Sequence, residues 1–122
     1  MKKDGGSGSD LRERAFEFAC AAVSVHRRVY RSDADLRDLS RQFVRAASAV
    51  GAMLEEADAG HSRADFISKC TIALKEAREA RYWLRILHRA CERERLSIEK
   101  LGKEATEIVA ILTTIIKRTR AR

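Results

Sequence analysis

Residues 45–87 read RAASAVGAMLEEADAGHSRADFISKCTIALKEAREARYWLRIL and contain two helical hydrophobic patterns separated by a short polar break. Apolar side chains recur every three or four residues over 46–57, and the same spacing returns over 66–87. The break at 58–62, DAGHS, contains a glycine followed by a serine, which is typical of one helix ending and another beginning. The segment therefore predicts a helical hairpin.

The helical spacing continues on both sides of this hairpin. Asp10 to Glu13 has the residue types of a capping box, and Ser97 precedes a further apolar stripe that it is expected to cap. The expected helices cover about 10–30, 35–57, 62–91 and 97–118. Because the connections are short, sequential helices should run antiparallel. The prediction is an all-α, up-down-up-down four-helix bundle, with these residues in its core: Phe18, Phe43, Val50, Phe66, Leu84 and Leu112.

The composition agrees with one helical domain. The chain has 122 residues, no proline and six glycines, which favours long helices over a sandwich or barrel that needs many turns. Residues 10–122 are expected to form the bundle with a basic C-terminal tail. Residues 1–9 include GGSGS, typical of a flexible native segment or an artificial linker. Without an apolar leader or a run of eighteen apolar residues, a cytoplasmic protein with no membrane partner is expected.

The sequence contains no recognisable catalytic, cofactor or metal site. A di-iron bundle needs Glu-x-x-His pairs, but the residues three before His26, His61 and His88 are Val, Asp and Arg. Cys20 and its two counterparts, Cys70 and Cys91, have no metal-ligand spacing and lie on apolar stripes, so buried thiols are expected. No glycine-rich phosphate loop or nucleophile-base pair is present. The expectation is a protein that is not an enzyme, with no cofactor and no small-molecule substrate.

The hairpin also carries three motifs of a known family. They are EEA at 55–57, SRADF at 62–66 and LKEAREARYWLR at 74–85. On these motifs the chain resembles the four helix bundle protein family, also known as the 23S rRNA intervening-sequence proteins. The chain departs from many members at Ala49, Met53 and Ala80, where serine, asparagine and threonine are common, and at Leu54, which replaces an aromatic residue.

The resemblance implies structural roles for the motif residues. We expect polar and aromatic anchors of the hairpin at Glu55, Glu56, Arg63, Asp65, Glu76, Glu79 and Trp83. Glu76 and Glu79 also alternate with Lys75 and three arginines at spacings that permit ion pairs along one helix. A solvated face with such pairs is the simpler interpretation, favoured over catalysis.

A net charge of +7 suggests an acidic partner. Basic residues cluster at the C-terminus and near the end of the first helix, giving these candidate nucleic-acid contacts: Arg27, Arg28, Lys117, Arg118, Arg120 and Arg122. Such contacts would supply sequence-independent affinity for phosphates. The alternative is a solvated helix end, because cations are favoured there by the helix dipole.

Two classes of function follow, and the first is preferred. It is a non-enzymatic oligomeric assembly module, because the resemblance implies ring-forming homopentamers and the fourth helix has more apolar surface than one core needs. Val109 and Ile116 are the expected interface with another subunit. The second class is an RNA-associated protein, implied by the family's link to ribosomal RNA genes. A related alternative is the accessory protein of a diversity-generating retroelement, which binds a reverse transcriptase and nucleic acid.

Overall fold

A computed structural model describes residues 7–122, which form four α-helices and two short 3-10 helices. The elements in chain order are α1 (Ser7–Ser32), η1 (Ala34–Leu36), α2 (Arg37–Asp58), α3 (Arg63–Ala90), η2 (Glu92–Glu94) and α4 (Arg95–Ala121). The predicted all-helical class is confirmed over this range. Within it, no helix is long and apolar enough to cross a membrane.

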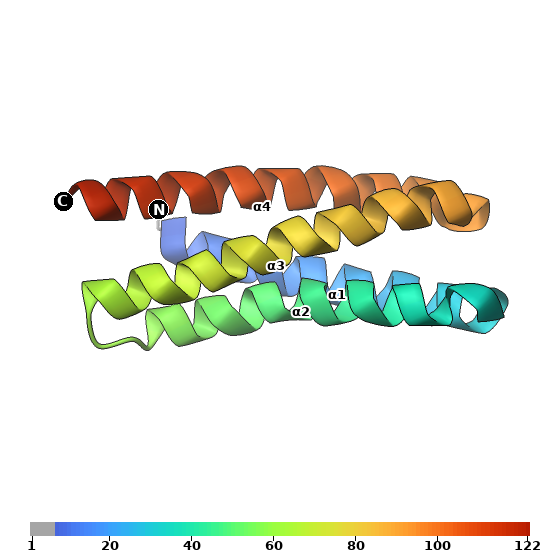
Figure 1. Cartoon of the computed structure of the whole chain (residues 1–122), viewed down its shortest axis with the longest axis horizontal. Helices are drawn as coiled ribbons and strands as arrows, with labels where there is room; N and C mark the ends of the chain where they lie inside the picture. The colour runs from blue at the N-terminus through green and yellow to red at the C-terminus, as the bar shows by residue number, and fades with distance from the viewer. Residues whose placement is uncertain (1–6) are drawn as a thin grey trace.

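The helices lie side by side and alternate in direction, so that each one returns along its predecessor (Figure 1). The polar connection between α2 and α3 covers residues 59–62, where the sequence predicted a turn. Ser62 caps α3 by accepting a hydrogen bond from the backbone N–H of Asp65 at 3.0 Å. α1 and α4 are joined by Arg14, whose guanidinium donates to Glu104 at 2.7 and 2.9 Å. These contacts close the four-helix bundle.

Two helix starts differ from the prediction. α1 begins at Ser7 instead of Asp10, so the segment assigned to a linker is partly helical, and residues 1–6 lie outside the described range. α4 begins at Arg95, directly after η2, and Ser97 is therefore not its cap. Glu94 precedes α4 and is buried against Arg28 of α1, with 2.9 Å between Oε1 and Nε. This pair between η2 and α1 lies at the start of α4 and is a contact that a local capping pattern could not reveal.

The core consists of the apolar stripes that the sequence predicted. Phe18, Phe43, Val50, Leu84 and Leu112 are buried. Phe66 is only partly buried and packs at the edge of the core. Two of the four family departures, Leu54 and Ala80, are buried, whereas Ala49 and Met53 are half-buried.

The predicted subunit interface on α4 is wrong. Val109 and Ile116 are buried within the single chain, at 9% and 5% exposure. The sequence argument assumed that one core could not cover so wide an apolar face. α4 packs against both α3 and α1, and two neighbours cover a wider arc than one does.

The first helix has apolar side chains outside its buried stripe. Phe16 and Val23 are 58% and 41% exposed. Cys20 is exposed between them, so the expectation of three buried thiols is also wrong, although Cys70 and Cys91 are buried. The buried stripe of α1 stays narrow, which leaves an apolar patch facing outward.

Glycines in the hairpin have separate packing roles. A Cβ on Gly51 would lie 3.7 Å from Ala15 of α1, in ordinary contact, so α1 and α2 pass close together there but would admit alanine. A Cβ on Gly60 would lie 2.4 Å from a carboxylate oxygen of Asp65. Gly60 therefore leaves room for the aspartate that follows the α3 cap.

Candidate nucleic-acid interface

The carboxylates of α3 are bound by the neighbouring helix. Arg45 of α2 reaches both of them, with 3.5 Å to Glu76 and 2.5 Å to Glu79. The indole N–H of Trp83 donates to the same Glu79 oxygen at 3.0 Å. These donors lower the pKa of Glu79, the Trp83 hydrogen bond contributing most. The predicted ion pairs along α3 are absent over residues 7–122, where Arg45 of α2 binds both glutamates instead.

Several cations on the outward face of α3 have no ion-pair partner in the described part of the chain. Lys75, Arg78, Arg85 and Arg89 are exposed, and none forms an ion pair within the described range. With Tyr82 they recur at spacings of three and four residues, so they lie in one row along the outward face of the helix. We call this row, Lys75, Arg78, Tyr82, Arg85 and Arg89, the basic stripe. At 1.5 Å per residue it is about 21 Å long.

Tyr82 and Trp83 are adjacent in sequence but differ in environment. Tyr82 is 54% exposed in the middle of the basic stripe, whereas Trp83 packs against the core and is bonded to Glu79. Their rings meet edge to face, with centroids 5.7 Å apart. Tyr82 is therefore an exposed aromatic ring, held at its edge by Trp83 and flanked by arginines. A ring so placed can stack on an unpaired base.

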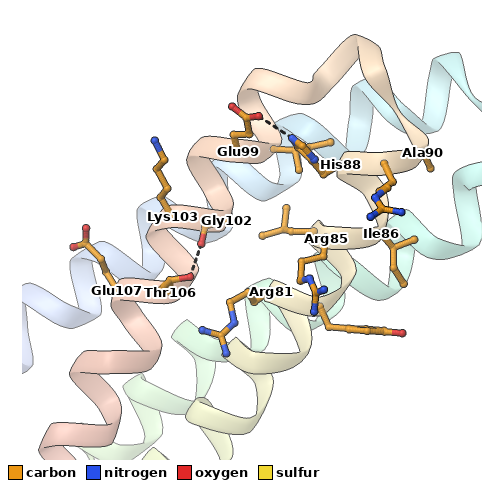
Figure 2. A pocket seen from close by; sticks show the side chains of 14 residues that line it. Arg81, Arg85, Ile86, His88, Ala90, Glu99, Gly102, Lys103, Thr106 and Glu107 are labelled. Atoms are coloured by element: carbon orange, nitrogen blue, oxygen red, sulfur yellow. Dashed lines mark hydrogen bonds and ion pairs between the residues drawn. The ribbon is translucent and has the colours of Figure 1, made fainter.

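A groove between α3 and α4 borders the basic stripe (Figure 2). It has a volume of about 1160 Å³ and its lining includes the apolar side chains Leu84 and Ile98. A Cβ on Gly102 would meet nothing within 4 Å, so the groove lies open over the backbone of α4. The His88–Glu99 contact, at 2.8 Å, bridges the two helices across the groove, and Arg81 extends from α3 beside it. The groove adds accessible surface beside the basic stripe.

The basic clusters predicted from the sequence are not brought together. The end of α1 and the end of α4 lie at opposite ends of the bundle (Figure 1). Arg27 is exposed at the first end, but Arg28 is engaged there by Glu94. At the other end lie Lys117, Arg118, Arg120 and Arg122, all exposed.

The C-terminal segment is also not a separate tail. α4 continues to Ala121, and Thr119 is buried. The Arg63 guanidinium donates to the backbone carbonyls of Thr119 and Arg122, at 3.3 and 2.6 Å. The last turn is thereby attached to the start of α3, which makes it part of the bundle.

The other motif residues make contacts near the hairpin. Glu55 lies 3.5 Å from Arg12 of α1, and Glu56 lies 3.7 Å from Lys69 of α3. Asp65 follows the α3 cap, as described above. Each of these side chains is therefore near a partner on another helix or near the turn. Through Glu55 and Glu56, the family motif thus forms polar contacts from α2 to α1 and to α3.

Within residues 7–122, no three or more histidine, cysteine or carboxylate side chains lie together in a group that could hold a metal ion. Burial raises the pKa of the Cys70 and Cys91 thiols. His26 forms a 2.7 Å hydrogen bond with buried Ser40, and burial with the nearby Arg41 charge lowers its pKa. These groups serve packing between helices.

The sequence analysis missed the basic stripe as a site. Its signal was present, because Lys75, Arg78, Tyr82, Arg85 and Arg89 follow the spacing of one helix face. Glu76 and Glu79 alternate with these cations in sequence, so a face with pairs along α3 was expected, although only Lys75 and Glu79 lie four residues apart. In the structure Arg45 of α2 binds Glu79, and Lys75 acts on that carboxylate without forming an ion pair.

Comparison with known proteins places this fold in a family. The profile of the 23S rRNA-intervening sequence protein family matches residues 9–114. A crystal structure of a protein of unknown function from the S23 ribosomal protein family of Bacteroides thetaiotaomicron is similar, with 36% identity and a TM-score of 0.81. The match covers 88% of this chain and 98% of that one. No curated protein matches the chain. Because the family profile spans most of the sequence, the chain belongs to the 23S rRNA-intervening sequence protein family.

Proposed function

We propose that this protein is a non-enzymatic helical scaffold that binds RNA along the basic stripe of α3. The observation that carries the proposal is the row of exposed cations whose neighbouring carboxylates are already bound by Arg45. A cation without an ion-pair partner can contact a phosphate without first breaking a salt bridge. Among polyanions we propose RNA as the ligand, because the family's description refers to 23S rRNA.

The stripe has the features of a sequence-tolerant binding surface. Four cations over about 21 Å can contact successive phosphates of one strand. Tyr82 lies among them with more than half of its surface exposed, in position to stack on an unpaired base. We therefore expect a preference for RNA with single-stranded or looped regions, and little dependence on base sequence.

Matched charge removals test the location of the site. Each of three double variants removes two exposed arginines or lysines: Arg78→Ala with Arg85→Ala in the stripe, Arg27→Ala with Arg31→Ala at the end of α1, and Lys117→Ala with Arg120→Ala at the end of α4. Fluorescence anisotropy with a labelled RNA hairpin at low salt should show roughly tenfold weaker binding for the stripe variant, at about 0.7 kcal/mol per lost contact. The other two should bind within about twofold of wild type.

Salt titration and Tyr82 sharpen the test. Each lost contact should reduce the slope of log affinity against log salt by about 0.7 on single strands. Tyr82→Ala should weaken binding to looped RNA by about 1 kcal/mol or more and leave duplex RNA binding unchanged. Equal losses in all three double variants would reject the stripe and indicate attraction by net charge alone. If wild type does not bind RNA at low salt, the proposal is wrong.

A second candidate function is assembly with further copies of the chain, which the family resemblance suggested as a homopentamer. The buried positions of Val109 and Ile116 remove the interface first expected on α4. The observation that still favours assembly is the exposed apolar patch on α1 around Phe16 and Val23. Apolar side chains exposed in this way would be stabilised by burial against another surface.

A further inference from the structure

We infer that a groove along the last turns of α4 binds a free long-chain carboxylic acid, with the alkyl chain on the apolar end of the groove and the carboxylate among arginines at the other end. The inference is independent of the proposed RNA binding, because the groove shares no residue with the basic stripe. It rests on the single sign of the charges that line the groove, on their position at one end, and on an accessible apolar floor.

The groove lies between the start of α3 and the end of α4, which are at the same end of the bundle (Figure 1). Its volume is about 700 Å³, within the range of roughly 300 to 1,000 Å³ that is usual for small-molecule sites. α3 contributes Arg63 and Phe66 to the lining, and all other lining residues belong to α4, between positions 110 and 122. The groove therefore follows the axis of α4.

The lining residues of α4 form two rows along the helix. A spacing of four residues gives the first row, which consists of Ala110, Thr114, Arg118 and Arg122. The second row lies beside it and consists of Ile111, Ile115 and Thr119. At 1.5 Å per residue, positions 110 to 122 span about 18 Å. Because the apolar side chains come first and the arginines last, the groove has an apolar end and a cationic end.

The cationic end carries three arginines, and no carboxylate side chain of residues 7–122 lines the groove. Arg118 and Arg122 are exposed, and neither forms an ion pair within that range. Arg63 donates through Nη1 to the backbone carbonyls of Thr119 and Arg122, so its positive charge is held beside the last turn by neutral acceptors. A carboxylate at this end would meet guanidinium groups, whose paired N–H donors match its geometry.

The apolar end has an accessible floor. Phe66, Ile111 and Ile115 are only half-buried and pack at the edge of the core. Ala110, at the far end from the arginines, is exposed and carries only a methyl group. An alkyl chain laid on this floor would remove both its own surface and that of the three larger side chains from water, which is favourable.

The uneven distribution of charge favours an acid with one alkyl chain over other occupants. An RNA strand carries a phosphate at every nucleotide, whereas the cations of the groove are confined to one end. A second copy of the chain would bring a net charge of +7 towards the three arginines. A long-chain carboxylic acid has one anionic group at one end of an apolar body, as the groove requires. Because the groove is open along its length, we expect a dissociation constant on the order of 100 µM.

Titration of ¹⁵N-labelled protein with dodecanoate, below the concentration at which it forms micelles, tests the site directly. The backbone amide signals of residues 63–66 and 110–122 should shift and reach saturation, whereas those of the basic stripe should not move. Dodecanol has the same alkyl chain without the charge. It should shift the signals of residues 110–115 but bind about fivefold more weakly, because it makes no ion pair with the arginines.

Two pairs of matched variants test the two ends of the groove. Arg118→Ala should weaken dodecanoate binding about fivefold and leave dodecanol binding unchanged. Arg120→Ala removes an equally exposed cation that does not line the groove, and it should change neither. Ala110→Trp fills the apolar end and should abolish the binding of both ligands. Ala52→Trp, at an exposed position of α2, is its control. Circular dichroism should show the same helix content in all four variants.

Several outcomes would overturn the inference. Signals that shift over the whole surface without saturation would mean that dodecanoate acts only as a detergent. Equal losses in Arg118→Ala and Arg120→Ala would mean attraction by net charge alone. Binding to phosphatidylglycerol vesicles without binding to dodecanoate would assign the surface to a membrane. If Ala110→Trp lowers the sedimentation coefficient of the protein without added acid, another copy of the chain occupies the groove. All of these are measured without RNA, so they do not depend on the outcome of the RNA-binding test.

Discussion

Both sides of α3 carry charged residues, but only those that face α2 are paired. On the side facing α2, Glu76, Glu79 and Trp83 are held by Arg45 and by one another. On the outward side, the cations of the basic stripe have no carboxylate partner among residues 7–122. The difference has two causes: Arg45 of α2 binds both glutamates, and Arg78 and Arg85 have no carboxylate three or four residues away on α3. The pairing of a charged helix face thus depends on its neighbours as well as on the spacing along the helix.

The adjacent aromatic residues give the largest contrast between the two sides. Trp83→Ala removes a ring that packs on the core and leaves Glu79 without its N–H donor. We expect it to lower the free energy of unfolding by about 2 kcal/mol, less than a fully buried aromatic would cost. Tyr82→Ala should change it by less than about 0.5 kcal/mol. Urea denaturation of both variants measures this, and equal losses would mean that Tyr82 also supports the fold.

The two kinds of arginine give a smaller contrast. Arg45→Ala leaves Glu76, whose side chain is only 14% exposed, without its cation. We expect a loss of about 1 kcal/mol in the free energy of unfolding, because a partly buried charge is then unpaired. Arg78→Ala, on the outward side, should cost no more than about 0.3 kcal/mol.

Thermal and urea unfolding should rank the two arginine variants in that order. The RNA-binding assay should rank them in reverse, since only Arg78 lies in the stripe. A result in which Arg78→Ala is the more destabilising variant would remove the distinction between the two sides of α3.

The sequence predicts the fold closely because the buried stripes are continuous. Phe43, Leu84 and Leu112 repeat with their neighbours at helical spacing, and Ser62 marks the start of α3 as a cap. Where the prediction fails, the cause lies on another helix. α4 begins at Arg95, directly after Glu94, which pairs with Arg28 of α1, whereas the local pattern pointed to Ser97.

The candidate site is less predictable for the same reason. The C-terminal cluster is conspicuous in sequence, but Arg63 attaches that segment to α3 and the other predicted cluster lies at the far end of the bundle. Val109 and Phe16 both widen the apolar face of their helix, yet Val109 is buried and Phe16 is exposed. The width of an apolar face in the sequence therefore does not show which of its residues point into the core. Whether such a side chain is buried depends on which helices lie beside its own. The spacing of apolar residues along one helix does not contain that information.

The acid dependence of Glu79 is the smallest effect expected. The Trp83 N–H and then Arg45 favour its ionised form, so its pKa in the folded protein lies below the ordinary value of 4.5. The unfolded chain therefore binds a proton at higher pH than the folded chain does. The resulting stabilisation is complete above the ordinary pKa and is lost as the pH falls through the folded pKa.

Glu79→Gln cannot gain or lose a proton, so it should lack this part of the acid dependence. The difference in free energy of unfolding between wild type and Glu79→Gln should stay constant from neutral pH down to about pH 5.5 and shrink below about pH 4.5. Trp83→Phe keeps the carboxylate but removes its strongest donor, and it should lie between the two. Urea titrations at each pH measure the three curves. If the wild-type and Glu79→Gln curves remain parallel into acid, the bonds to Trp83 and Arg45 do not stabilise the Glu79 carboxylate in solution, and the α2-facing side of α3 is held by packing alone.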